Sequence, residues 1–309
     1  MRLRRSALIS PADNRTLVEK QADGLSDVCI LELEDGVYET RKEFARQQGA
    51  QLLRELDWRG RERVVRINSL NGPHGARDIE VITSGRPDAI LMAKVQSADE
   101  VVRASRLLAE AEERHGIEVG STLIWSMIET AKGLMNVEEI CQADPRMTAV
   151  LFGAGDLGVD LQIKRLGLGS FRRTGVPAYE YAYGKGRVVA AARAAGLDPI
   201  DVGHSTFTDA EATRRSAEFS AQMGFAGIIV YTPRQVPIAN ELFSPPPEDL
   251  AWANEVVSKF DAANRNSEKT VVVVDGEMID GPFVLNARQI LERARIIHEA
   301  EKQRTRRVA

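Results

Sequence analysis

Hydrophobic residues in this chain gather in short runs, and the longer segments between them place apolar residues at helical spacing. Eight runs of four to seven residues share this character: Ser6–Ser10, Val28–Leu33, Arg63–Ile67, Ala89–Met92, Thr122–Ile128, Thr148–Phe152, Pro199–Gly203 and Gly227–Tyr231. Short apolar runs that alternate with amphipathic segments are typical of repeated βα units. Eight such units predict an α/β protein, and specifically a (β/α)8 TIM barrel rather than an open sheet.

The segments between and after these runs complete the predicted architecture. Helices are expected at Val18–Gly24, Arg41–Leu56, Ala98–His115 and Asp209–Met223, and further helices near Asp249–Ala263 and Ala287–Glu301. The glycine-rich segment Gly158–Pro177 predicts a long loop over the barrel mouth. We therefore expect the barrel over residues 1–245 and a C-terminal helical extension over residues 246–309, which packs near a barrel mouth of its own or a neighbouring subunit.

Polar residues follow most of the predicted strands. They share a position at or just beyond the end of a run: Glu34, Asp35, Arg66, Asn68, Lys94, Glu129, Asp156 and Asp201. In a (β/α)8 barrel the loops after the strands form the active-site face. These residues are therefore expected to line one mouth.

Glu129 and Asp156 end the fifth and sixth runs, so they emerge side by side if those runs are neighbouring parallel strands. Two carboxylates without a nearby histidine or cysteine suit Mg2+ better than zinc. Each acid also precedes an apparent helix, which leaves helix capping or a helix-dipole interaction as the alternative. The pair on consecutive strands favours the metal.

Three further residues near the predicted mouth have alternative interpretations. Arg66 ends a buried-looking strand, which favours substrate binding over a surface ion pair. Lys94 could form a Schiff base as in a class I aldolase, but beside an acidic metal pair a supporting ion pair is preferred. His204 is interpreted as structural, because a lone histidine more often has that role.

Composition narrows the class of protein. A net charge of -4 gives no reason to expect a nucleic-acid surface, and 43% hydrophobic with 28% charged residues is ordinary for a globular protein. The two cysteines, Cys29 and Cys141, form no spaced metal or redox motif, so a cytoplasmic location is expected. We expect neither a signal peptide nor a membrane span.

Seven stretches carry a family resemblance. They are RRSALISPADN at Arg4–Asn14, LELEDGV at Leu31–Val37, VRIN at Val65–Asn68, MAKV at Met92–Val95, MIETAKGL at Met127–Leu134, FGAGDLGVDL at Phe152–Leu161 and VDGEMIDGP at Val274–Pro282. In this order they resemble the citrate lyase β-subunit-like (CitE-like) group of the HpcH/HpaI aldolase superfamily, which includes malyl-CoA and citramalyl-CoA lyases. The resemblance implies a Mg2+-dependent TIM barrel that makes or breaks a carbon–carbon bond.

The resemblance also implies roles for single residues. Glu129 and Asp156 match the metal ligands. Arg66 and Arg5 match arginines that hold substrate oxygens, and Gly155 is assigned to the substrate site beside Asp156. Asp280 matches an acidic residue from the C-terminal region that reaches an active site, in some members that of a neighbouring subunit, where it can act as general acid or base.

The implied reaction is cleavage of a 3-hydroxyacyl-CoA of the malyl- or citramalyl-CoA type into an acyl-CoA and a 2-oxo acid such as glyoxylate or pyruvate. Ile228 and Thr232 stand where many members have a lysine and a histidine, which leaves the CoA contacts open. The alternatives are an aldolase acting on a free 4-hydroxy-2-oxo acid and a non-catalytic subunit of a lyase complex. The family association favours a homo-oligomer, either a trimer or a hexamer.

Overall fold

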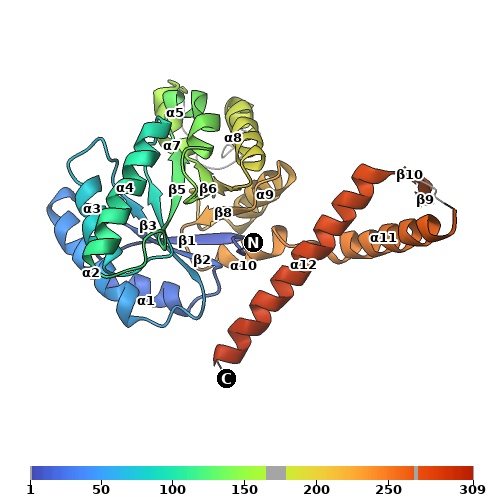
Figure 1. Ribbon diagram of the computed structural model, residues 1–309, viewed down its shortest axis with the longest axis horizontal. Coiled ribbons are helices and arrows are strands. Elements are labelled where there is room, and N and C mark those ends of the chain that lie inside the picture. The colour runs from blue at the N-terminus through green and yellow to red at the C-terminus, as the bar shows by residue number, and fades with distance from the viewer. Residues whose placement is uncertain (1, 165–178, 268–270, 309) are drawn as a thin grey trace. The chain divides into compact units, whose positions relative to one another are not determined.

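The computed structural model describes residues 2–164, 179–267 and 271–308, and its largest feature is a closed parallel barrel (Figure 1). Eight strands form it in chain order: β1 (Ser6–Pro11), β2 (Val28–Glu32), β3 (Glu62–Ile67), β4 (Ala89–Met92), β5 (Leu123–Ile128), β6 (Met147–Phe152), β7 (Asp198–Val202) and β8 (Gly227–Val230). β8 pairs with β1 and closes the barrel. The predicted (β/α)8 fold is confirmed, because eight apolar runs became eight strands in sequence order.

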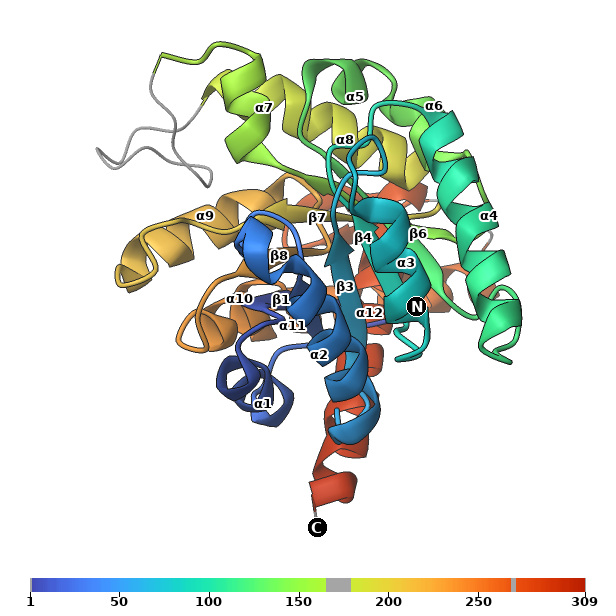
Figure 2. The same cartoon turned by 90° about the vertical axis from the view of Figure 1, so that its left-hand side faces the viewer.

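Helices surround the strands, as two perpendicular views show (Figures 1 and 2). They are α1 (Arg15–Asp23), α2 (Lys42–Glu55), α3 (Gly75–Thr83), α4 (Ala98–Arg114), α5 (Ala131–Met135), α6 (Val137–Cys141), α7 (Ala154–Asp160), α8 (Ala182–Ala194), α9 (Ala210–Gln222) and α10 (Val236–Leu242), with short 3-10 turns at Glu39–Arg41 and Tyr179–Tyr181. Local chemistry fixes several ends. Asn14 caps α1 by accepting the Leu17 N–H, and Asp209 caps α9 by accepting the Ala212 N–H. Gly224, with φ 92°, ends the turn after α9.

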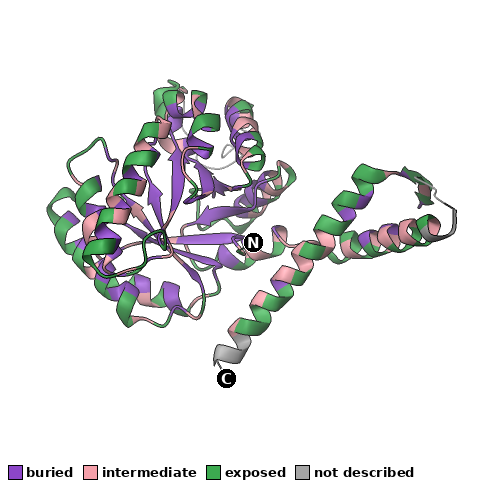
Figure 3. Cartoon of the chain, in the orientation of Figure 1, coloured by how far each residue is buried: buried purple, intermediate pink, exposed green. Residues whose placement is uncertain are grey.

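The strands are almost entirely buried, whereas the outer helix faces are exposed (Figure 3). β2, β4 and β8 have no exposed position, since side chains on one face fill the barrel and those on the other meet the helices. This double burial explains why the strands appear in the sequence as continuous apolar runs. The predicted loop at Gly158–Pro177 begins inside α7, and its residues 165–178 lie outside the described part of the chain.

Arg4 and Arg5 precede β1 and therefore lie at the amino end of the barrel. The Arg4 guanidinium binds both carboxylate oxygens of Glu62 at 2.7 Å and lies 4.7 Å from the centre of the Trp125 ring. Arg5 is 3% exposed, and its Nε lies 2.9 Å from Asp27 Oδ2. The predicted place of Arg5 beside Arg66 is thus corrected: strand direction places Arg5 at the opposite end of the barrel.

The C-terminal region has its own small core. The chain divides into two compact units, one of Arg4–Asn240 and one of Met1–Leu3 with Glu241–Ala309. The second unit contains α11 (Pro247–Ser267), α12 (Gly281–Val308) and a hairpin of β9 (Val272–Val274) and β10 (Glu277–Ile279). Six buried residues form its core: Ala253, Val256, Val274, Ile279, Val284 and Ala287. The predicted C-terminal helical extension is confirmed, and a short hairpin lies between its two long helices.

The hairpin follows from two residues. Asp275 and Gly276 have φ values of 50° and 82°, the positive pair that a tight type I′ turn requires.

Among the helices that the structure describes, none combines the length and the apolar composition that a membrane-spanning helix needs.

Candidate active site

Glu129 lies directly after β5 and is 3% exposed. It does not cap the helix that follows, because Thr130 does so by accepting the Gly133 N–H at 3.0 Å. The Glu129 carboxylate turns instead toward the strand end of β4, where its Oε1 accepts the backbone N–H of Lys94 at 2.8 Å. The capping alternative therefore fails for Glu129.

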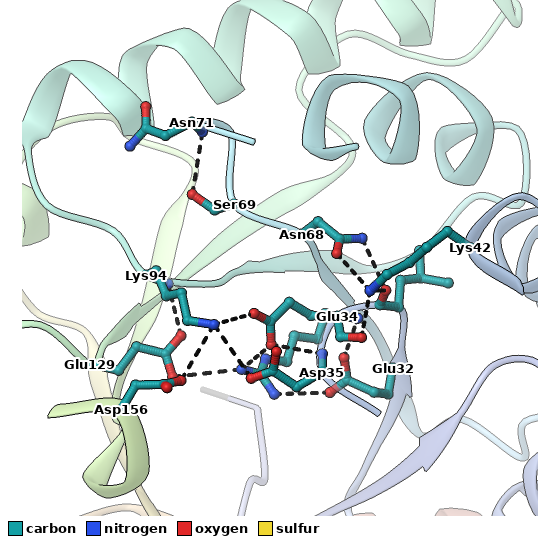
Figure 4. Close-up of polar contacts among 12 residues, drawn as sticks. Glu32, Glu34, Asp35, Lys42, Asn68, Ser69, Asn71, Lys94, Glu129 and Asp156 are labelled. Carbon is teal, nitrogen blue, oxygen red and sulfur yellow. Dashed lines mark hydrogen bonds and ion pairs between the residues drawn. The ribbon is translucent and has the colours of Figure 1, made fainter. Parts of the chain in front are cut away.

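Asp156 is the third residue of α7, which begins directly after Gly153 at the end of β6. Its Oδ2 lies 3.5 Å from the Lys94 ammonium, and its side chain is 40% exposed. Gly155 immediately precedes it in the first turn of the helix. Figure 4 shows Asp156 and Glu129 next to each other, as expected for acids that follow neighbouring parallel strands.

Arg66 lies in β3, opposite Glu32 in the register of β2. One nitrogen of its guanidinium is 3.1 Å from Glu32, and the other is 2.6 Å from Glu34 and 3.6 Å from Glu129. These acids outweigh the effect of burial and raise the pKa of Arg66, so the charge is permanent. Its Nε is buried without a hydrogen-bond acceptor among the described residues. The acids around Arg66 thus leave its donors incompletely paired.

The Lys42 side chain holds the loop that follows β2. Lys42 Nζ donates to the carbonyls of Leu33 and Glu34, and to Asn68 Oδ1, at 2.8, 2.6 and 2.8 Å respectively (Figure 4). This buried lysine fixes the chain that carries Glu34. The role of Glu32 was not predicted, although its two-residue spacing from Glu34 marks both as facing the same side of the barrel.

Lys94 forms ion pairs with three acids. Its Nζ lies 2.5 Å from Glu34 Oε1, 3.4 Å from Asp35 Oδ2 and 3.5 Å from Asp156 Oδ2. Although burial opposes the charge, the bond to Glu34 and the nearby acids raise the pKa of Lys94. A Schiff-base nucleophile must be a neutral amine, so the geometry favours the ion-pair interpretation.

Negative charge exceeds positive charge in this cluster. Two cations, Arg66 and Lys94, lie among five carboxylates. The carboxylates are those of Glu32, Glu34, Asp35, Glu129 and Asp156. Burial raises the pKa of Glu129 to about 7; Arg66 opposes this rise, and the charges of Glu34 and Asp156 add to it. A divalent cation beside Glu129 would offset this repulsion.

The donor set fits Mg2+ and does not fit zinc. In the described residues no group of three or more His, Cys, Asp or Glu side chains is arranged to hold a metal. Mg2+ is usually held by one or two carboxylates, and its remaining positions are filled by water or substrate oxygens. Glu129 and Asp156 are therefore the residues that would hold the ion.

Gly153 admits the Glu129 side chain. A Cβ at this position would lie 2.6 Å from Glu129 Cβ and 3.0 Å from its Oε2. The backbone of Gly153 has φ -98°, which any residue can adopt, so a substitution acts only by sterics.

We expect Gly153→Ala to displace the Glu129 carboxylate and to weaken Mg2+ binding by about 10–100-fold, the usual effect of disturbing a ligand's support. Gly186→Ala is the matched control, because its Cβ would meet nothing within 4 Å. Isothermal titration calorimetry of both variants measures the effect. Equal Mg2+ affinity in the two variants would contradict the steric argument.

Two further predicted acids, Asp201 and Asp280, take no part in the ion pairs of this cluster. Asp201 does not line the mouth: it is buried between sheet and helices, where it binds Lys185 of α8 and Ser220 of α9 at 2.5 Å each. Asp280 belongs to the C-terminal unit, between β10 and α12, and its Oδ1 is buried without a partner among the described residues.

His204 and Tyr231 follow β7 and β8. His204 Nδ1 accepts the Thr206 N–H at 3.0 Å, in keeping with a structural role. Burial raises the pKa of Tyr231 to about 12, and the positive charge of Arg66 opposes this rise. Tyr231 is therefore a neutral phenol within electrostatic reach of Arg66, which the sequence did not single out.

A closed parallel barrel with paired acids and an arginine at the carboxyl ends of its strands defines the chain as a (β/α)8-barrel enzyme. Within that class it belongs to the HpcH/HpaI aldolase/citrate lyase family, whose model matches residues 5–233. The predicted family is confirmed, and the chain is an enzyme of a lyase family.

Individual relatives carry different names. A (3S)-malyl-CoA thioesterase of Cereibacter sphaeroides (strain ATCC 17029) is 33% identical over 95% of both chains. A citrate lyase subunit beta of Leuconostoc mesenteroides is 29% identical over 98% of this chain and 97% of its own length. The protein CitE of Mycobacterium tuberculosis, solved with magnesium, acetoacetate and coenzyme A, is 30% identical with a TM-score of 0.77, covering 94% of this chain and 97% of its own.

Proposed function

We propose that this protein is a Mg2+-dependent carbon–carbon lyase that cleaves a malyl- or citramalyl-CoA-type thioester into an acyl-CoA and a 2-oxo acid such as glyoxylate or pyruvate. One observation carries the proposal: Arg66, whose buried Nε has no acceptor among the described residues, lies 3.6 Å from Glu129 in an acidic cluster that also contains Asp156. An anion-binding donor beside a metal-binding carboxylate pair is the arrangement that a chelating 2-oxo acid requires.

Each protein group has a distinct task. Glu129 and Asp156 would hold Mg2+, which when bound supplies Lewis-acid polarisation of the 2-oxo acid oxygens. Arg66 attracts the carboxylate of the same fragment through its permanent charge. Glu32 and Glu34 keep its guanidinium oriented through their ion pairs with it. The protein thereby fixes the fragment in one orientation.

The names of relatives support a CoA thioester as the substrate. CitE was solved with magnesium, acetoacetate and coenzyme A, and the Cereibacter relative is named for malyl-CoA. Ile228 and Thr232 replace the lysine and histidine that many family members have. Ile228 is buried in β8 in register with Ser6, near the start of both strands. Only Thr232, two residues beyond β8, lies at the carboxyl end, which keeps the free 4-hydroxy-2-oxo acid as an alternative substrate.

A second candidate is hydrolysis of the thioester, since the relative named a thioesterase covers 95% of this chain at 33% identity. Product analysis separates these activities. Incubation with malyl-CoA and Mg2+ should yield acetyl-CoA and glyoxylate, detected by chromatography and a phenylhydrazine assay. Malate with free CoA thiol would indicate the thioesterase. Cleavage of free hydroxy-oxo acids alone would indicate the aldolase, and tight association with a second protein without turnover a non-catalytic subunit.

We further propose a cytoplasmic homo-oligomer, a trimer or hexamer, in which Asp280 acts at a barrel mouth of its own or a neighbouring subunit. Cys29 and Cys141 are both buried and are not joined in a disulfide, which suits a reducing compartment. The C-terminal unit exposes Val273, Met278 and Leu285, which lie in β9, β10 and α12. It also contains Asp280, whose Oδ1 has no partner among the described residues. Exposed apolar surface of this kind often marks a subunit contact.

Sedimentation measures the size of the assembly, and complementation tests the role of Asp280. Inactive Asp280→Asn and Glu129→Gln chains, mixed after partial unfolding, should regain activity if Asp280 acts on a neighbour. Recovery fails if it acts within its own chain. A monomer in sedimentation would contradict the assembly proposal.

A further inference from the structure

Lys94 has a backbone conformation that lysine rarely adopts. Its φ is 56°, two residues after the end of β4. A non-glycine residue in this left-handed region is strained, so the surrounding contacts must hold it there. The conformation aims the Lys94 N–H at Glu129 Oε1, 2.8 Å away. Lys94 therefore orients a metal-binding carboxylate through its main chain.

The side chain of the same residue reaches the other acids of the mouth (Figure 4). Its ammonium has carboxylate oxygens of Glu34, Asp35 and Asp156 around it at 2.5, 3.4 and 3.5 Å. These oxygens come from the loop after β2 and from α7, so the ammonium lies where two acidic loops converge. Hard carboxylate oxygens are the ligands that divalent cations prefer. An internal cation thus takes the position that an external one could occupy.

We propose that Lys94 is a positioning residue that restricts the active site to a single divalent ion. Its main chain directs Glu129 toward that ion, while its ammonium neutralises Glu34 and Asp35 and withholds them from a second one. The inference rests on the proposed Mg2+ site and goes beyond it, since it assigns the metal stoichiometry to one side chain. Without the ammonium, the Glu34 and Asp35 carboxylates would be available to a second divalent ion, since one or two carboxylates suffice to hold one.

Mn2+ binding tests this inference without any substrate, because Mn2+ replaces Mg2+ in oxygen sites and free Mn2+ is counted by electron paramagnetic resonance. Lys94→Met should raise the stoichiometry from about one to about two ions per chain, because three carboxylates lose their internal cation. Lys94→Gly should do the same and fold readily, since glycine adopts positive φ without strain. Lys94→Arg keeps the charge and should stay at about one ion.

Two controls separate the possible outcomes. Lys132→Met removes an exposed lysine from α5 and should leave the stoichiometry unchanged. Adding Glu34→Gln to Lys94→Met should return the stoichiometry to about one ion, because the second site loses a ligand. A wild-type chain that binds no Mn2+ contradicts the proposed metal site itself. A wild-type chain and a Lys94→Met chain that both bind one ion contradict only the role assigned to Lys94.

Discussion

Glu129→Gln is expected to abolish Mg2+-dependent turnover, lowering kcat by on the order of a thousandfold. An amide cannot replace the charge of a carboxylate ligand, and loss of Lewis-acid stabilisation worth about 4 kcal/mol corresponds to that factor. Steady-state assays with the thioester substrate at saturating Mg2+ measure it. Glu138→Gln, at an exposed glutamate on α6, is the matched control and should leave kcat within about twofold.

Stability provides an independent measurement of the same variant. Because burial raises the pKa of Glu129 to about 7, its ionised form is unfavourable in the metal-free protein at pH 8. The Glu129→Gln chain should therefore unfold at the same temperature as the metal-free wild type or a higher one. Mg2+ should raise the unfolding temperature of the wild type alone. A variant that is still stabilised by Mg2+ would show that Glu129 is not a ligand.

Arg66→Lys is expected to lower kcat/KM by about a hundredfold, because one ammonium cannot pair with Glu32 and Glu34 and also bind the substrate carboxylate. Its ion pairs with Glu32 and Glu34 at 3.1 and 2.6 Å also orient the guanidinium, and lysine cannot make both in the same geometry. Competitive inhibition by pyruvate should weaken in parallel. Replacing Arg66 by a neutral residue is less informative, because it leaves buried acids without a cation. Such a change lowers the free energy of unfolding by about 3–5 kcal/mol.

Arg63 is the matched control for Arg66. It lies on the same strand, but its side chain binds Asp88 at 2.9 Å and the Leu53 carbonyl of α2, on the helix side of the sheet. Arg63→Lys should therefore change kcat/KM by no more than about twofold. If Arg63→Lys and Arg66→Lys impair activity equally, then Arg66 acts through stability of β3 rather than through substrate binding.

The barrel was predictable because both faces of a parallel strand are buried. Each strand therefore appears in the sequence as an apolar run, and polar residues follow where the chain reaches solvent. β4 was predicted with its observed bounds, Ala89–Met92, and the ends of β5 and β6 with theirs. Apparent helices were expected after Glu129 and Asp156, where α5, α6 and α7 lie, but their bounds were not predicted. They have five to seven residues, which is too short for a helical period to emerge from the sequence.

The candidate site was predicted in part. Glu129, Asp156 and Arg66 could be located because each lies at or just beyond a strand end, and strand ends of one barrel share a mouth. Arg5 could not be placed, because the resemblance supplied its role while its position before β1 put it at the other end. Asp201 lies inside its run, and its side chain points outward to Lys185. Alternate residues of a strand face opposite sides of the sheet, so the position of Asp201 within β7 decides which way its side chain points. A short apolar run does not show which residues face the barrel interior.

By itself, the sequence determined the eight-stranded barrel, the family and the acids that follow β5 and β6, since these depend on the order and spacing of residues. Only the tertiary structure decided which strand-end residues meet, because contacts between β2, β3, β4 and α7 join positions far apart in the chain. It also showed that Thr130, not Glu129, caps α5 and that Lys94 reaches three acids from a left-handed backbone. Backbone conformation and ion-pair geometry arise from the folded environment, which no local pattern encodes.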